Sequence, residues 1–207
     1  LVRRWVPKIE ARPDAPEGEI YHIQAWEVPG LLGAGDLVLS RYVAPLVPLL
    51  IQCVQRDVDA AVKGGDIAED LKNICKRAYK SDIFVDIEDY AEKRKSKLKG
   101  SALADFEDKI KAIELVILEE SPKNLGQLEV AINKYFKRRV TKASAVLSTI
   151  HKAKGLEAER VFVLDSKRLP KRWEGQSKRE FDEEVHCLVV ALTRSTQTLF
   201  MCSGGIE

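Results

Sequence analysis

The chain has 207 residues, of which 45% are apolar, and its formal net charge is +2. This length and apolar content are sufficient for the core of one large domain, or of one domain with an insertion. The nearly balanced charge excludes strong overall basicity as a basis for nucleic-acid binding, so any such site must be local.

Cysteine usage and hydropathy indicate the cellular compartment in which the protein is expected. Cys53, Cys75, Cys187 and Cys202 lie in apolar surroundings without C-x-x-C spacing, which favours a reduced cytoplasmic protein over a disulfide scaffold or a metal site. No apolar run has membrane-spanning length and no signal peptide is recognisable, so we expect no membrane association. The chain begins at Leu1 without an initiator methionine, which fits a C-terminal piece of a longer protein.

The first predicted elements are a strand and a series of helices. Residues 18–26 alternate in hydropathy as a strand does, and a helix is predicted over residues 67–79. The composition then changes to charged amphipathic helices, predicted over residues 86–98, 102–120 and 125–139.

A polar cluster follows in the last third of the chain. It lies between a short apolar run at residues 146–147 and a buried-type strand at residues 161–164. Polar residues between apolar strands predict a cleft. There Gly155 allows a ligand to approach the backbone, and Glu157 can accept hydrogen bonds from hydroxyls such as those of a ribose. From this segment alone, a solvated loop with a turn glycine is equally compatible.

A helix predicted over residues 183–194 begins with acids and ends on Thr193 and Arg194, after which residues 198–201 resume as a strand. The planar guanidinium of an arginine beside a cleft suits a phosphate. Taken alone, Arg194 is more typical of a surface or helix C-terminal arginine.

Together the two segments resemble motifs V and VI of the UvrD/Rep-type superfamily 1 helicases, roughly T-L-H-x-A-K-G-L-E and E-E-x-R-x-x-Y-V-A-x-T-R-A. The residues that agree in register are Thr149, His151, Ala153, Lys154, Gly155, Leu156, Glu157, Glu183, Glu184, Val190, Ala191, Thr193 and Arg194. Residues 36–41, followed by a helix from about 44 to 56, resemble motif IV, and residues 62–71 resemble the family's next strand, Gly-Gly turn and helix. The resemblance implies an α/β fold with a RecA-like parallel sheet flanked by helices, in which residues 18–26 form an edge strand.

The resemblance also implies how a nucleotide is bound. The chain would be the second RecA-like motor domain, which closes over ATP held by the N-terminal motor domain of the same protein. Arg41 and Arg194 are expected to reach the γ-phosphate as the catalytic arginines. Gly155 and Glu157 are expected to bind the nucleotide, with the carboxylate on its sugar.

The same resemblance implies contacts to single-stranded or partly duplex DNA from Thr149, His151 and Lys152. The expected activity is that of an ATP-dependent DNA helicase or translocase. The sequence has no G-x-x-x-x-G-K-[ST] loop and no acid pair for Mg²⁺. We therefore expect ATP and Mg²⁺ to be held mainly by the missing domain, and the chain alone to be inactive.

Three parts are expected along the chain. Residues 1–79 form the first part of the motor domain, residues 80–140 a helical insertion that resembles a shortened accessory subdomain, and residues 141–207 the remainder.

Two alternatives remain at this point. One is a degenerate, non-hydrolysing module that binds single-stranded nucleic acid, against which the presence of both Arg41 and Arg194 argues. The other is an unrelated α/β binding protein, against which three motifs in the family's order argue. Two basic clusters, residues 93–99 and 135–139, are compatible either with nucleic-acid contacts or with solvated helix faces.

Overall fold

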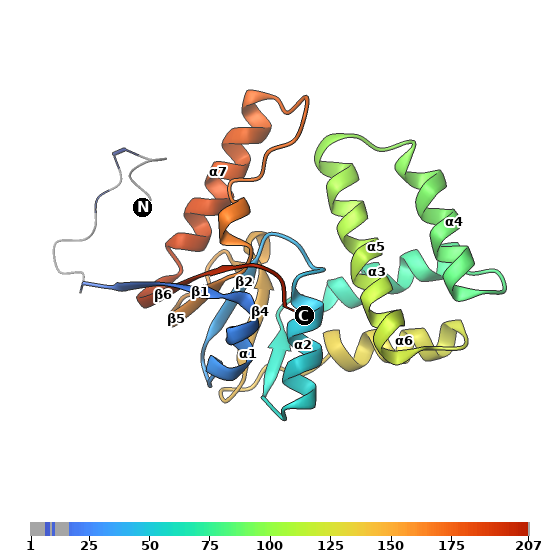
Figure 1. Ribbon diagram of the computed structural model, residues 1–207, viewed down its shortest axis with the longest axis horizontal. Coiled ribbons are helices and arrows are strands. Elements are labelled where there is room, and N and C mark those ends of the chain that lie inside the picture. Colours follow the sequence, from blue (N-terminus) through green and yellow to red (C-terminus); the bar gives the residue numbers. More distant parts are fainter. Residues whose placement is uncertain (1–6, 9, 11–16, 207) are drawn as a thin grey trace.

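The structure is a computed structural model that describes residues 7–8, 10 and 17–206. Within these residues, six strands form one parallel sheet in the order β1-β6-β5-β2-β4-β3 (Figure 1). The strands are β1 (Glu19–Gln24), β2 (Leu37–Ser40), β3 (Ala60–Val62), β4 (Ala145–Thr149), β5 (Ala158–Val163) and β6 (Ser195–Ser203). This is the predicted α/β RecA-like fold, and β1 lies at the sheet edge as expected.

Helices cover both faces of the sheet, as a parallel sheet requires. On one face, Leu39 of β2 and Val163 of β5 pack in a cluster with Leu188 of α7 (Lys178–Leu192), and the short helix η3 (Ile150–Ala153) joins them. On the other face, Val38 and Phe162 pack with α1 (Val28–Leu31) and α2 (Leu46–Gln55). Successive strand residues point to opposite faces, so each central strand contributes to both clusters.

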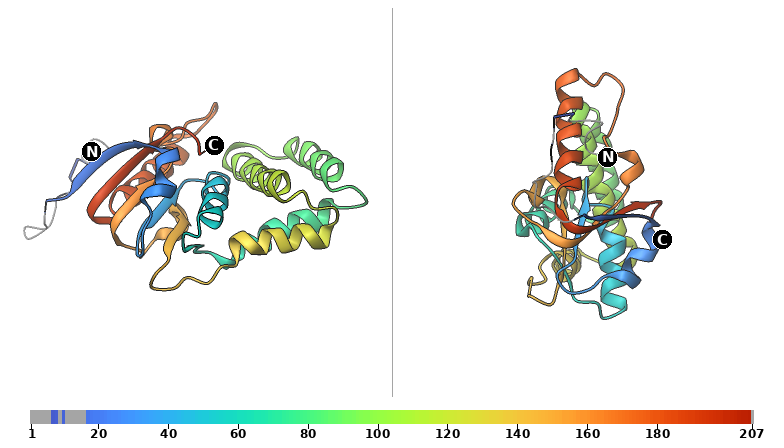
Figure 2. Two further views of the ribbon diagram at one scale, coloured as in Figure 1. Left: turned by 60° about the horizontal axis from the view of Figure 1, so that its bottom comes forward. Right: turned by 90° about the vertical axis from the view of Figure 1, so that its left-hand side faces the viewer.

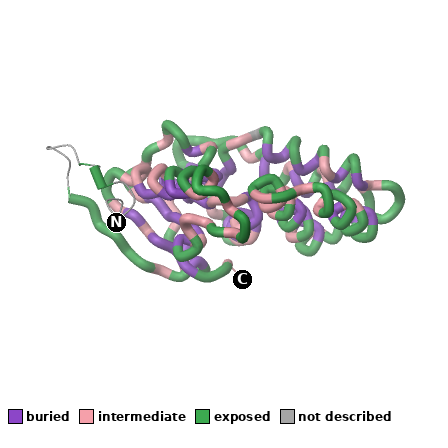
Figure 3. Tube along the Cα trace, turned by 90° about the horizontal axis from the view of Figure 1, so that it is seen from above, coloured by how far each residue is buried: buried purple, intermediate pink, exposed green. Residues whose placement is uncertain are grey.

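Four further helices extend the second of these clusters beside the sheet (Figure 2). They are α3 (Gly65–Ala78), α4 (Ile83–Lys95), α5 (Gly100–Glu120) and α6 (Leu125–Phe136). Leu71, Ile113 and Ile132, on three of them, are fully buried. Figure 3 shows buried residues in both the sheet and these helices, so one apolar core continues from one part into the other.

Four helices begin earlier than the sequence patterns predicted, and in α4 and α7 a side-chain cap accounts for the earlier start. α7 begins at Lys178 rather than at residue 183, since the Ser177 hydroxyl accepts from the Glu180 N–H and the Glu180 carboxylate accepts from the Ser177 N–H. α4 begins at Ile83, since the carboxylate of Asp82 accepts from the Val85 N–H. The charged first turn of α7 hides its start from a purely apolar pattern, whereas α4 begins with the apolar residues Ile83, Phe84 and Val85.

The four cysteines are free and buried. Burial raises the pKa of the Cys53 thiol to about 11 and of the other three to about 12. In the part of the chain that the structure describes, no helix has the length and apolar character needed to cross a bilayer.

Candidate functional site

The carboxyl ends of β2 and β4 bring several predicted site residues to one edge of the sheet. These strands are neighbours, so the residues that follow them meet. A cavity of about 200 Å³ lies there, between the sheet edge and helices α3 and α5, and we call it the strand-end groove. Its charged and hydroxyl lining includes Arg41, Thr149, His151 and Lys152 from the sheet side and Asp70, Asp105, Asp108 and Lys109 from the helices. The residues predicted to contact DNA are therefore together, and Arg41 is with them.

Arg41 is held by an acid of α7. Its Nε lies 2.9 Å from Oε1 and 3.2 Å from Oε2 of Glu184, and its Nη2 lies 2.7 Å from Oε1. The side chains are only 10% and 4% exposed. The remaining Nη1 lies 3.6 Å from Oδ1 of Asp105 on α5, which is beyond hydrogen-bond distance. Glu184 thus neutralises Arg41, and only the Nη1 side of the guanidinium is open to another acceptor.

Lys152 is positioned by the Gly-Gly turn. Gly64 has φ +129°, and a Cβ there would lie 3.0 Å from Cδ of Lys152, so the lysine stem packs directly on the glycine. The ammonium of Lys152 donates to the carboxylate of Asp66 at the start of α3. This hydrogen bond lowers the pKa of Asp66. The turn and the acid together fix the lysine at the groove.

His151 has an exposed surface, yet the groove wall partly desolvates its imidazole. Burial lowers the pKa of His151, and the charge of Arg41 lowers it further. The imidazole is therefore neutral at neutral pH. It can donate or accept a hydrogen bond there, but it adds no positive charge.

Asp108 ties α5 to the loop after β2. Its two carboxylate oxygens accept from the N–H groups of Val43, at 2.6 Å, and Ala44, at 2.8 Å. Burial nevertheless raises the pKa of Asp108 to about 6. No pattern in the sequence pointed to this contact, because the residues lie far apart in the chain.

A second cluster lies at the other end of the parallel strands, where β5 and β6 begin. It consists of Gly155, Glu157 and Arg194. Gly155 has φ +84°, which favours glycine. Arg194 donates from Nε to the carbonyl of Val190, at 3.1 Å, and from Nη1 to the carbonyl of Leu156, at 3.2 Å. The carboxylate of Glu157, 63% exposed, lies 3.9 Å from Nη1. The structure thus places the two predicted nucleotide-binding residues beside this arginine.

The second cluster borders a cavity whose described lining includes Glu157 but neither Gly155 nor Arg194. A Cβ on Gly155 would have no neighbour within 4 Å, and Glu157, Thr193 and Ser195 line a cavity of about 740 Å³. An exposed carboxylate can accept from sugar hydroxyls, and a guanidinium can meet a phosphate. Within the described residues there is no group of three His, Cys, Asp or Glu that could hold a metal ion.

The structure does not bring Arg41 and Arg194 together. Arg41 follows the carboxyl end of β2, whereas Arg194 precedes the amino end of β6. Its partner Glu184 lies near the middle of α7, and a helical rise of about 1.5 Å per residue places Arg194 about 15 Å further along. The two arginines therefore have different partners here: Arg41 is bound to the carboxylate of Glu184, and Arg194 to carbonyls of Val190 and Leu156.

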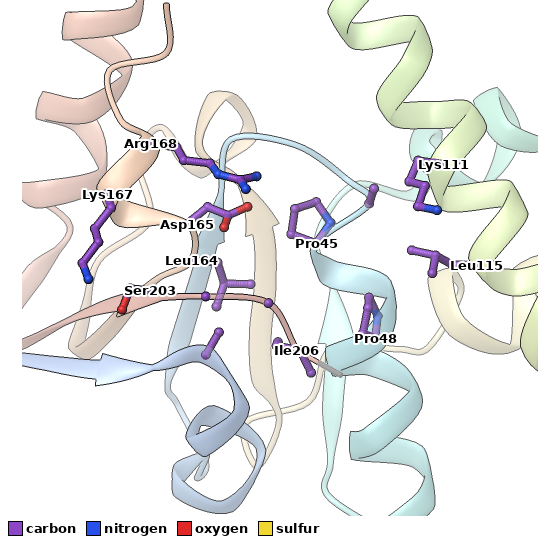
Figure 4. Close-up of a pocket in the computed structure, with 14 residues that line it drawn as sticks. Pro45, Pro48, Lys111, Leu115, Leu164, Asp165, Lys167, Arg168, Ser203 and Ile206 are labelled. Carbon is purple, nitrogen blue, oxygen red and sulfur yellow. The ribbon is translucent and has the colours of Figure 1, made fainter.

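Another cavity, of about 430 Å³, contains none of the predicted site residues. Figure 4 shows Asp165 and Arg168 facing Pro45 across it, with Lys111 and Leu115 of α5 on the far side. It follows β5 at the same sheet edge as the strand-end groove.

The two basic clusters lie at the carboxyl ends of α4 and α6 and continue beyond them. Tyr135 and Phe136 are each 1% exposed, so their rings belong to the apolar core and are not available to contact bases. Lys137 pairs with Glu69 at 2.6 Å. In the other cluster, Lys95 pairs with Glu92 at 3.5 Å, which is typical of a solvated helix face.

The sequence motifs assigned no role to Glu184, although it matched the family pattern. Asp66, Asp70, Asp105 and Asp108 were also missed, because ordinary helix-face acids carry no local signal of what they contact.

Comparison with known proteins gives the family. Residues 61–204 match the UvrD-like helicase C-terminal domain. This range includes every predicted site residue except Arg41. A probable DNA helicase of Mycoplasma pneumoniae is 45% identical over 64 residues, which are 30% of this chain but only 12% of that protein. The chain therefore belongs to the family of UvrD-like helicase C-terminal domains.

Proposed function

We propose that the chain is the C-terminal motor domain of an ATP-dependent DNA helicase or translocase that acts in the cytoplasm. It supplies Arg194 to an ATP site that the N-terminal motor domain completes. It also supplies contacts to single-stranded DNA. The observation that carries this proposal is the position of α7, which has the strand-end groove beside Glu184 and the Gly155–Glu157–Arg194 cluster at its end. A single helix can then transmit movement between the two sites.

The nucleotide-side residues would act when the two domains close. ATP supplies the phosphoryl group and Mg²⁺ the charge neutralisation, both held mainly by the N-terminal domain. Glu157 accepts hydrogen bonds from the sugar, and the free N–H groups of Arg194 meet the phosphate that is transferred. An arginine that arrives only on closure stabilises the transition state more than the ground state. The chain alone, without a phosphate-binding loop, does not hydrolyse ATP.

The residues proposed to contact DNA would act at the strand-end groove. Thr149 and His151 offer hydrogen bonds, and Lys152 offers a charge to the backbone of single-stranded or partly duplex DNA. Arg41 belongs with this group rather than with the phosphate, because Glu184 holds it at the strand-end groove.

The decisive experiment measures ATP hydrolysis with and without single-stranded DNA, in the native protein that carries both motor domains. Arg194→Ala is compared with wild type and with Arg179→Ala, an arginine on the same helix whose side chain is 90% exposed. We expect strand-stimulated hydrolysis to fall about a thousandfold in Arg194→Ala only, with strand binding retained. Equal loss of hydrolysis and strand binding would contradict the assigned role.

A non-hydrolysing single-strand-binding module is the second candidate. It is favoured by the contacts of Arg194, whose Nε and Nη1 both donate to carbonyls of its own chain. Strand binding without hydrolysis in the wild-type native protein would support this candidate.

A further inference from the structure

The cations of the strand-end groove are all paired with carboxylates of the chain itself. The described lining contains three cationic residues, Arg41, Lys109 and Lys152. Nη1 of Arg41 lies 3.6 Å from Asp105, Nζ of Lys109 lies 3.0 Å from Asp70, and the Lys152 ammonium is hydrogen-bonded to Asp66. Because His151 is neutral, the groove carries no excess of positive charge with which to attract a nucleic-acid backbone.

In each pair the acid lies further out than the cation. The side chains of Asp66, Asp70 and Asp105 are 66%, 51% and 54% exposed, whereas those of their cationic partners are 32%, 35% and 10% exposed. A ligand that arrives from solvent therefore meets the carboxylates first. The cations are the less exposed partners of these pairs.

These pairs are also of a kind that exchanges readily. Ion pairs with an exposed partner contribute little to stability, because water solvates both ions when the pair opens. Arg41 would stay in place during such an exchange, since Nε and Nη2 remain bonded to the buried Glu184. Only its Nη1 side would change partner.

From this arrangement we propose that Asp66, Asp70 and Asp105 occupy the positions of strand phosphates and keep the groove neutral until a single-stranded nucleic acid displaces them. The proposal rests on the proposed function of the strand-end groove as the site that binds single-stranded DNA. A phosphate oxygen carries the same charge as a carboxylate oxygen and accepts the same hydrogen bonds. The acids thus set a threshold: an isolated phosphate gains little by replacing one of them, whereas a strand replaces several at once.

The test measures binding of a fluorescein-labelled oligodeoxythymidine to the 207-residue chain by fluorescence anisotropy. Asp66→Asn, Asp70→Asn and Asp105→Asn are made singly and as one combined variant. Each of these variants is compared with the control Asp89→Asn. Asp89 is an exposed acid on α4 that pairs with Lys93 outside the groove, so its variant measures the effect of charge alone. Each groove variant should bind about two- to fivefold more tightly than this control, on the scale of an exposed ion pair. In the combined variant, affinity should fall more steeply with salt between about 50 and 200 mM.

A second comparison separates a direct effect from a structural one. If Asp66 acts by occupying Lys152, the gain from Asp66→Asn should disappear in the Lys152→Gln background. The single variants also keep the test valid if the combined variant does not fold. Groove variants that bind no more tightly than Asp89→Asn would overturn the inference.

The proposed function can fail separately. If Lys109→Gln and Lys152→Gln leave strand affinity unchanged, the groove is not the strand site, and both proposals are overturned. If these variants weaken binding while the Asp→Asn variants bring no gain, only the inference is overturned.

Discussion

Arg41 at the end of β2 and Glu184 on α7 form an ion pair in which Nε and Nη2 both donate to Oε1, at 2.9 and 2.7 Å. The pair joins the sheet edge to the helix that leads to Arg194. With both side chains nearly buried, neither ion has water as a substitute partner. The pair therefore fixes the position of α7 against the sheet.

Replacing one ion of this pair should be costly. Glu184→Gln leaves the guanidinium of Arg41 without its counter-charge, and we expect a loss of about 3 kcal/mol in the free energy of unfolding. Glu183→Gln, which breaks the exposed pair with Arg179, should cost less than about 1 kcal/mol. Urea unfolding of both variants tests this. Equal losses would mean that the Arg41 pair is as weak as a surface pair.

Gly64→Ala should affect both stability and strand binding. The φ of +129° strains any other residue, and the new Cβ would push the Lys152 stem away from the groove. We expect a loss of about 1 to 3 kcal/mol in stability and weaker binding of single-stranded DNA. Gly175→Ala is the matched control, because Gly175 also has a positive φ but no neighbour near its added Cβ. It should lose stability alone. Unchanged strand binding in Gly64→Ala would contradict the role of the turn.

Asp108 should make stability depend on pH. Its pKa is about 6 in the folded protein and about 4 when unfolded, so the folded state binds more protons between these values. The contribution of Asp108 to stability is then fully present below about pH 4 and is lost as pH rises towards 6. The free energies of unfolding of wild type and Asp108→Asn are measured from pH 4 to 7. The wild-type value minus the variant value should fall as the pH rises. A constant difference would show that Asp108 titrates normally.

Glu157→Ala should separate nucleotide affinity from catalysis. The carboxylate is expected to contact the sugar, which changes little as the phosphate is transferred. Uniform binding of this kind raises KM on removal and leaves kcat nearly unchanged. Steady-state hydrolysis by the native protein, with Glu159→Ala as a neighbouring exposed control, measures both. A loss of kcat alone would count against a sugar contact.

The resemblance to the helicase motifs was sufficient to predict the parallel sheet, and local apolar runs located several of its strands. The sequence could not show that Arg41 is held by Glu184, since that contact joins residues 143 positions apart in the chain. It also missed the acids of the groove. Asp105 and Asp108 resemble any exposed helix residue until α5 packs against the loop after β2. The cap at Ser177, by contrast, is readable in the sequence, and an interpretation based on apolar periodicity passed over it.

The segment from Ile150 to Glu157 connects the carboxyl end of β4 to the amino end of β5 and so passes from one edge of the sheet to the other. The height of the sheet therefore sets its length. A residue inserted between Lys152 and Gly155 would displace either the groove side or the nucleotide side, because both ends are fixed to strands. The number of residues between His151 and Glu157 is thus as much a part of this site as their identity.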